Sequence, residues 1–229
     1  MQRAASQAGL VFRQTMDRRE FVAFLAALPA TVTGCKPPRP VGPVAFGYKM
    51  SWFTVRSEDI QKVVESFGLL RPKPANWQAG IEWAYQLKGV FVAPPLDGWI
   101  AVVGLGSEDF ANPDPVSPAK RRIESASELF HVSCSFATHR VTEYHHWIRA
   151  EEGRVTRCFA YLGERGEVLC NAGAVTPAEQ TLSFAKLPPD QWQPDESDVM
   201  KIASVWSYDP SKLTSSSGRA SLGVIGTLQ

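Results

Sequence analysis

The sequence of 229 residues lacks several of the features that assign a protein to a functional class. No uninterrupted apolar run reaches the roughly 18–20 residues of a membrane-spanning helix. The 24 lysines and arginines almost balance the 23 aspartates and glutamates, so a net charge of +1 provides no basic field for nucleic acid. A hydrophobic content of 44% and a charged content of 21% are those of a folded chain, and the length favours one domain.

Motifs for cofactors, metals and nucleophiles are also missing. No serine stands in a G-x-S-x-G nucleophile elbow, and no two cysteines have the spacing of a structural zinc site. Gly104-Leu105-Gly106 follows an expected strand, but Asp109 occupies the third glycine position of a dinucleotide-binding loop. We therefore expect no cofactor and no bound metal.

What is present begins at the N-terminus, where residues 1–34 have the organisation of an export signal. Arg18 and Arg19 precede a short apolar segment, residues 21–28, and small residues follow it. Val32-Thr33-Gly34-Cys35 resembles a bacterial lipobox, in which the cysteine is lipidated and becomes the new N-terminus. The resemblance implies a membrane-anchored protein that faces the periplasm, on the cell membrane or the outer membrane.

Two questions about this signal stay open in the sequence. Residues 17–21 resemble a twin-arginine export motif, although Asp17 replaces the usual serine or threonine, and paired arginines also occur in general secretory signals. Met16 is an alternative translation start. Residues 35–43 then form the lipidated cysteine and a proline-rich tether, about 25 Å long at ~3.1 Å per residue.

The remaining chain predicts a single α+β domain over residues 44–210 and a flexible tail over residues 211–229. Because the strands come in consecutive pairs, we expect a mainly antiparallel sheet built from hairpins, with helices packed on one face and two pseudo-equivalent halves. Periodicity and capping residues predict helices over 57–68, 76–87 and 118–130, a short one after Thr176 and a last one after Asp195. Expected strands are 44–55, 90–93, 99–104, 132–138, 141–150, 155–162 and 167–170, and residues 71–74 are expected to form a loop.

Four stretches of this domain are distinctive: residues 48–53 (YKMSWF), 90–99 (VFVAPPLDGW), 138–147 (THRVTEYHHW) and 159–167 (FAYLGERGE). They resemble a family of bacterial proteins to which no activity is assigned. The resemblance covers roughly residues 44–210, and it transfers no catalytic residue.

Four cysteines are present, and lipidation of Cys35 would leave Cys134, Cys158 and Cys170. An odd number allows at most one disulfide and one free thiol. We favour the simpler interpretation that all three are small buried residues without a bridge.

Residues 138–147 hold three of the four histidines. Alternation along a strand would place Glu143, His145 and Trp147 on one face and Tyr144 and His146 on the other. His139, Glu143 and His145 are therefore the candidates for a catalytic or metal-binding cluster. No third ligand accompanies Glu143 and His145 at a recognisable spacing, so we favour structural hydrogen bonds.

Aromatic residues with polar neighbours suggest an interface. Trp83 and Tyr85 lie beside Glu82 on an expected helix face, and Trp147 shares a strand face with charged residues. Exposed aromatic residues of this kind anchor binding partners, whereas half-buried packing is the alternative.

These features favour a lipid-anchored envelope protein that binds another protein, for example as an immunity or inhibitor protein, and that is not an enzyme. One alternative is a metal-dependent or hydrolytic enzyme that uses His139, Glu143 and His145. A second alternative is a structural lipoprotein that takes part in envelope assembly.

Overall fold

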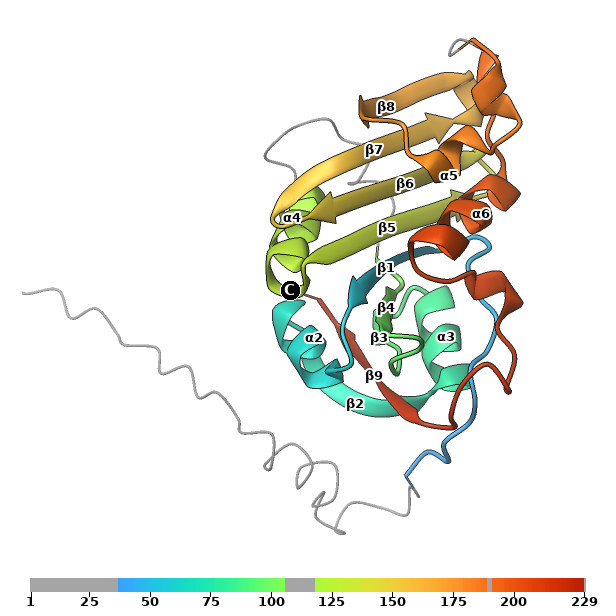
Figure 1. Ribbon diagram of the computed structural model, residues 1–229. Coiled ribbons are helices and arrows are strands. Elements are labelled where there is room, and N and C mark those ends of the chain that lie inside the picture. Colours follow the sequence, from blue (N-terminus) through green and yellow to red (C-terminus); the bar gives the residue numbers. More distant parts are fainter. Residues whose placement is uncertain (1–36, 106–117, 189–190, 229) are drawn as a thin grey trace, which may run out of the picture. The chain divides into compact units, whose positions relative to one another are not determined.

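The computed structural model describes residues 37–105, 118–188 and 191–228 (Figure 1). The predicted export signal with Arg18 and Arg19, and the predicted lipidation site Cys35, lie outside these residues. Within the described ranges, none of the helices has the length and apolar character needed to cross a membrane.

The described residues contain a nine-stranded sheet with the order β2-β9-β3-β4-β1-β5-β6-β7-β8. All eight pairings between neighbouring strands are antiparallel. The strands are β1 (Ser51–Arg56), β2 (Leu70–Asn76), β3 (Val90–Val92), β4 (Trp99–Val103), β5 (Val132–His139), β6 (Tyr144–Glu151), β7 (Arg154–Leu162), β8 (Glu167–Gly173) and β9 (Leu222–Thr227). Together with the helices, this sheet confirms the α+β class. The two equivalent halves stay a prediction.

The helices begin where the sequence provides caps. The helices are α2 (Ile60–Ser66), α3 (Trp77–Tyr85), α4 (Pro118–Phe130), α5 (Pro177–Gln180) and α6 (Glu196–Trp206), with 3-10 turns η1 (Gly163–Arg165), η2 (Phe184–Lys186) and η4 (Pro210–Lys212). The Asp195 carboxylate accepts a hydrogen bond from the Asp198 backbone N–H at 3.0 Å. Thr176 and Glu179 form the expected capping box.

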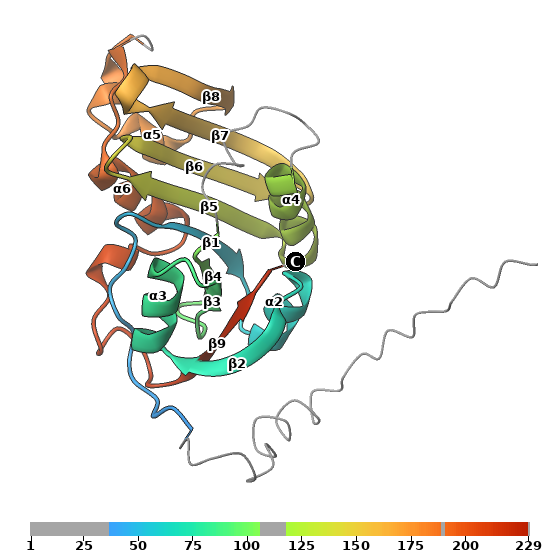
Figure 2. The ribbon, with the colours of Figure 1, turned by 180° about the vertical axis from the view of Figure 1, so that it is seen from behind.

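The helices cover both faces of the sheet, so the prediction that they pack on one face is wrong (Figures 1 and 2). Helices α3, α5 and α6 share one hydrophobic core with Trp52 of β1, whereas α2 and α4 share a second core with Phe53 of the same strand. The physical reason is that the central strands are apolar at successive positions. All five residues of β4 are buried, and such a strand needs cover on both sides.

Two segments expected to lack regular structure pair with each other at the edge of the sheet. Residues 71–74 belong to β2, and part of the predicted tail 211–229 forms β9, which lies between β2 and β3. An edge strand tolerates prolines such as Pro72 and Pro74, because an N–H that faces away from the sheet is not needed for pairing. The predicted flexible tail is therefore replaced by a strand whose partners are distant in sequence.

The start of the described chain is held against the domain. The side-chain amide of Asn76 donates a hydrogen bond to the backbone carbonyl of Arg39 at 3.0 Å, and Val41 pairs with Ser221. Residues 39–41 therefore contact the sheet edge, whereas the sequence predicts that they belong to a proline-rich tether.

Strands β7 and β8 are joined by a disulfide between Cys158 and Cys170. The favoured prediction of no bridge is wrong, and the alternative of one disulfide with one free thiol describes the structure. Antiparallel pairing brings the two Cα atoms to 6.2 Å, within the range that a disulfide spans. Cys134 stays free, and burial raises the pKa of its thiol to about 12.

Candidate functional site

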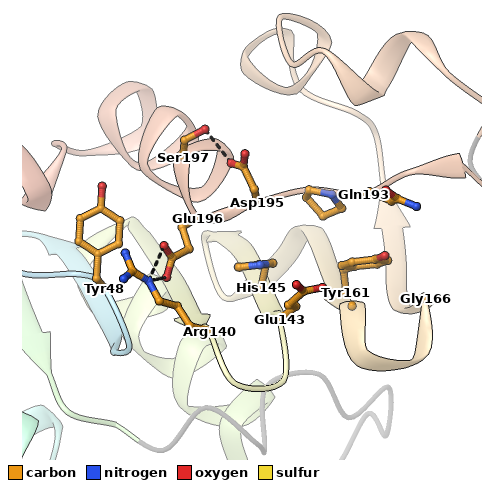
Figure 3. Close-up of a pocket in the computed structure, with 12 residues that line it drawn as sticks. Tyr48, Arg140, Glu143, His145, Tyr161, Gly166, Gln193, Asp195, Glu196 and Ser197 are labelled. Carbon is orange, nitrogen blue, oxygen red and sulfur yellow. Dashed lines mark hydrogen bonds and ion pairs between the residues drawn. The ribbon is translucent and has the colours of Figure 1, made fainter.

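A pocket of about 660 Å³ lies between one end of the β6–β7 pair and the start of α6 (Figure 3). The turn between β5 and β6 contributes Arg140 and Glu143, β6 contributes His145, and β7 contributes Tyr161. The opposite wall comes from residues 193–197, which lead into α6. The pocket therefore depends on segments that lie more than 30 residues apart in the sequence.

An ion pair closes one side of this pocket. The Arg140 Nε donates hydrogen bonds to both carboxylate oxygens of Glu196, at 2.8 and 2.9 Å, and hydrogen bonding to Glu196 raises the pKa of Arg140. The guanidinium carbon also lies 5.2 Å from the centre of the Tyr48 ring, a cation–π distance. The pair links the β5–β6 turn to α6 and places a tyrosine over the arginine.

His145 lies at the base of the pocket and is 4% exposed. Burial lowers the pKa of His145 below its ordinary value of 6.5, and the carboxylates around it, of which Glu196 is the strongest, offset only part of that shift. The ring is therefore neutral at pH 7. Its Nδ1 is buried and has no hydrogen-bond partner among the residues that the structure describes.

Glu143 reaches the same pocket from the turn before β6. Its backbone has φ of 50°, a left-handed conformation that ends the β5–β6 turn. A Cβ at Gly163 would lie 2.5 Å from the Glu143 side chain, so glycine at that position is what allows the carboxylate to lie there. Glu143 and His145 thus line the same pocket, although Glu143 lies outside the strand on which alternation placed it.

His139, the third member of the predicted cluster, does not line this pocket. Its Nδ1 lies 3.1 Å from the hydroxyl of Thr142, in the exposed turn at the end of β5. In the ranges that the structure describes, no group of three or more histidine, cysteine, aspartate or glutamate residues is arranged to hold a metal ion.

His146 points to the other face of β6 and forms a buried chain of hydrogen bonds that the sequence did not reveal. Its Nε2 lies 2.8 Å from the Ser135 hydroxyl, and its Nδ1 lies 2.9 Å from the Tyr144 hydroxyl. Burial, with a smaller contribution from His145, lowers the pKa of His146 to about 3. The only signal in the sequence was strand alternation, which separates His146 from His145 but does not show its cross-strand partner.

A second, smaller hollow of about 420 Å³ adjoins the first, and both are lined by Tyr48 and Arg140. Tyr85 of α3 lines it as well. Tyr48 and Tyr85 are 44% and 54% exposed. The two hollows thus form one groove, which we call the Tyr48–Arg140 groove and define by the lining of both.

Of the three aromatic residues predicted at an interface, only Tyr85 lies in this groove. Trp83 is partly buried, and Lys88 lies over its ring at 5.9 Å. Trp147 is completely buried, so its prediction as an interface residue is wrong.

Trp147 is buried because its indole takes part in a buried ion pair beneath the sheet face. The Trp147 indole N–H donates to the Glu179 carboxylate at 2.8 Å, and the same carboxylate accepts from the Arg157 Nε at 2.8 Å. The Trp147 ring also stacks on Phe159 at 4.4 Å between centres. Trp147, Arg157 and Glu179 are therefore part of the core.

Comparison of the chain with protein-family models, with curated proteins and with solved structures finds no match.

Proposed function

We propose that this chain is an exported, lipid-anchored protein of a bacterial cell envelope that binds another protein through the Tyr48–Arg140 groove. The immunity and inhibitor classes are of this type. The observation that carries the proposal is that an exposed tyrosine and an arginine lie at the junction of two adjoining hollows. Tyrosine and arginine are enriched among the residues that dominate binding energy at protein interfaces.

The chemistry of the groove suits recognition. Arg140 is held in place by Glu196, and its guanidinium lies over the Tyr48 ring, so both side chains are ordered before a partner arrives. Preorganised side chains lose less conformational entropy on binding. Tyr85 extends the aromatic surface onto α3.

The test of the groove is capture of a partner from the cells that produce the protein. We expect a stoichiometric partner to co-purify with the full chain, and Tyr48→Ala to weaken its binding about 30-fold, the effect of a residue worth ~2 kcal/mol. Leu129→Ala is the control, because this residue is 48% exposed on α4, on the opposite face of the sheet. Equal binding by the wild-type and Tyr48→Ala chains would exclude the groove as the interface.

The anchor has a separate test. If Val32-Thr33-Gly34-Cys35 is a lipobox, Cys35→Ala abolishes lipidation and releases the protein from membranes. Fractionation of the cells and the mass of the mature N-terminus report both effects. An unchanged mass together with unchanged membrane association would contradict the anchor and leave the binding groove unaffected.

A second candidate function is an enzyme that uses the polar pocket, and the observation that favours it is the juxtaposition of Glu143 and His145. Elemental analysis of protein purified without chelator tests its metal-dependent form. One equivalent of zinc, iron or manganese that disappears in His145→Ala would favour the enzyme over the binding protein.

A further inference from the structure

His145 is a buried polar side chain in the lining of the pocket, and its hydrogen bonding is incomplete among the described residues. Buried polar atoms in folded proteins nearly always have a hydrogen-bond partner, because an unsatisfied one costs about 1–3 kcal/mol. His145 is 96% buried, its Nδ1 has no partner within the described part of the chain, and its ring lies in the pocket between Glu196 and Tyr161 (Figure 3). A neutral imidazole has one nitrogen that donates a hydrogen bond and one that accepts, so the charges around the ring decide which ligand suits the site.

The charges around His145 determine whether the pocket suits a positively or a negatively charged ligand. Glu143, Asp195 and Glu196 contribute three negative charges to the pocket lining, Arg140 contributes one positive charge, and His145 is neutral. The formal sum is 1 − 3 = −2. Because Arg140 already pairs with Glu196, the Glu143 carboxylate beside His145 is available to an incoming cation.

An anion is excluded from the same place by the start of α6. A helix N-terminus attracts anions when its N–H groups are free. Here the Asp195 carboxylate accepts from the Asp198 backbone N–H, and the Asp198 carboxylate accepts from the Asp195 backbone N–H at 3.2 Å. The protein's own carboxylates therefore occupy the anion-binding position.

The remaining walls suit a chain of methylene groups. Tyr161 and Pro194 line the pocket and are themselves buried, so each presents little more than one face to it. Gly163 and Gly166 line it without side chains. A volume of about 660 Å³ has room for one long side chain with water around it.

We propose that this pocket binds a basic side chain, lysine or arginine, which the protein partner inserts between Glu143 and His145. The inference rests on the proposed function and adds the chemical class of the recognised residue. The aliphatic part of the side chain lies along Tyr161 and Pro194, and its cationic nitrogen donates to the Glu143 carboxylate beside the His145 ring.

The experiment uses small probes, so it does not depend on knowing the partner. The ¹⁵N-labelled full chain with Cys35→Ala is titrated with N-acetyl-lysine-methylamide and N-acetyl-arginine-methylamide, and the imidazole nitrogens of His145 are followed by NMR. The titration reaches about 50 mM, above the roughly millimolar dissociation constant that one side chain provides. The matched neutral probe is N-acetyl-lysine-methylamide acetylated on its side-chain nitrogen.

We expect the cationic probes to shift the His145 nitrogens in a saturable way and Glu143→Gln to weaken binding about tenfold, the value of one charged hydrogen bond. Glu143 is exposed, so this variant is expected to fold. Glu128→Gln is the matched control, because Glu128 is an exposed carboxylate on α4, on the opposite face of the sheet. Equal weakening by both variants would overturn the proposal.

An absent His145 response, or an equal response to the neutral probe, would also overturn it. These results are independent of the partner-capture experiment. Partner binding that is lost in Tyr48→Ala while no probe shifts His145 would leave the groove as an interface and reject the basic side chain. Saturable probe binding without any captured partner would support the site for a basic side chain and reject the groove as a protein interface.

Discussion

His145 and His146 are neighbours on β6 but lie in opposite environments. Both are buried, and burial lowers the pKa of both rings. His146 has a hydrogen-bond partner on each ring nitrogen, Ser135 on one side and Tyr144 on the other. His145 lines a pocket with carboxylates, and none of the described residues bonds to its Nδ1.

The comparison separates two uses of a buried polar side chain. A fully satisfied ring holds neighbouring strands in register and contributes to stability. A ring with an unmatched nitrogen costs stability, so the fold alone does not account for it. We therefore assign His146 a role in stability and His145 a role in the candidate site. Substitutions on the two faces of the sheet test this difference.

The largest effects should come from the two hydrophobic cores. Trp206→Ala, on the α6 side, and Phe67→Ala, at the end of α2 on the other side, should each lower the free energy of unfolding by about 3–5 kcal/mol. Urea unfolding measures both, and Val205→Ala is the control because this α6 residue is 66% exposed. A change near zero for either core variant would show that its face is not a packed core.

The same substitution at the two neighbouring histidines should give different results. His146→Leu leaves the Ser135 and Tyr144 hydroxyls without their partner and should cost about 2–4 kcal/mol. His145→Leu removes an unsatisfied nitrogen from a buried position and should change stability by less than ~1 kcal/mol. Equal losses in urea unfolding would remove the distinction between the two rings.

The pH dependence of stability should come mainly from His146. Its pKa of about 3 in the folded protein is below the ordinary value of 6.5, so the unfolded chain binds the proton more readily. The stabilisation is therefore complete above pH 6.5 and is lost as the pH falls toward 3, by about 2 kcal/mol between pH 7 and pH 5. His146→Leu should flatten this slope, and His131→Asn should not, because the His131 side chain is 76% exposed.

The smallest effect on stability should be at the groove itself. Arg140→Gln breaks the ion pair with Glu196, but the arginine side chain is 56% exposed, and exposed pairs contribute about 0–1 kcal/mol. Capture of the partner should nevertheless weaken strongly. If Arg140→Gln lowered the stability as strongly as it weakened partner binding, Arg140 would have a structural role.

Local signals in the sequence predicted much of the fold. The caps at Thr176 and Asp195 and the apolar spacing of Val63, Val64 and Phe67 all mark elements or buried faces that the structure contains. Alternation along β6 correctly separated His145 from His146. These signals succeed because capping and periodicity involve residues within one or two turns of each other.

The failures share a physical cause. Nothing near residues 222–227 indicates a partner, because β9 pairs with β2 and β3, more than 120 residues earlier. The disulfide of Cys158 and the burial of Trp147 likewise depend on which residue lies across the sheet. The prolines at 72 and 74 suggested a loop. Prolines fit a β-strand mainly at the edge of a sheet, and only the assembled sheet shows that this strand lies at an edge.

The sequence by itself determined the α+β class and the helix caps at Thr176 and Asp195. Only the tertiary structure decided that both faces of the sheet are covered, that His139 lies apart and that Arg140 joins Glu196 beneath Tyr48. The reason is that hydrogen-bond partners and opposing charges come from distant segments. Their meeting follows from strand order and register, which no local pattern specifies.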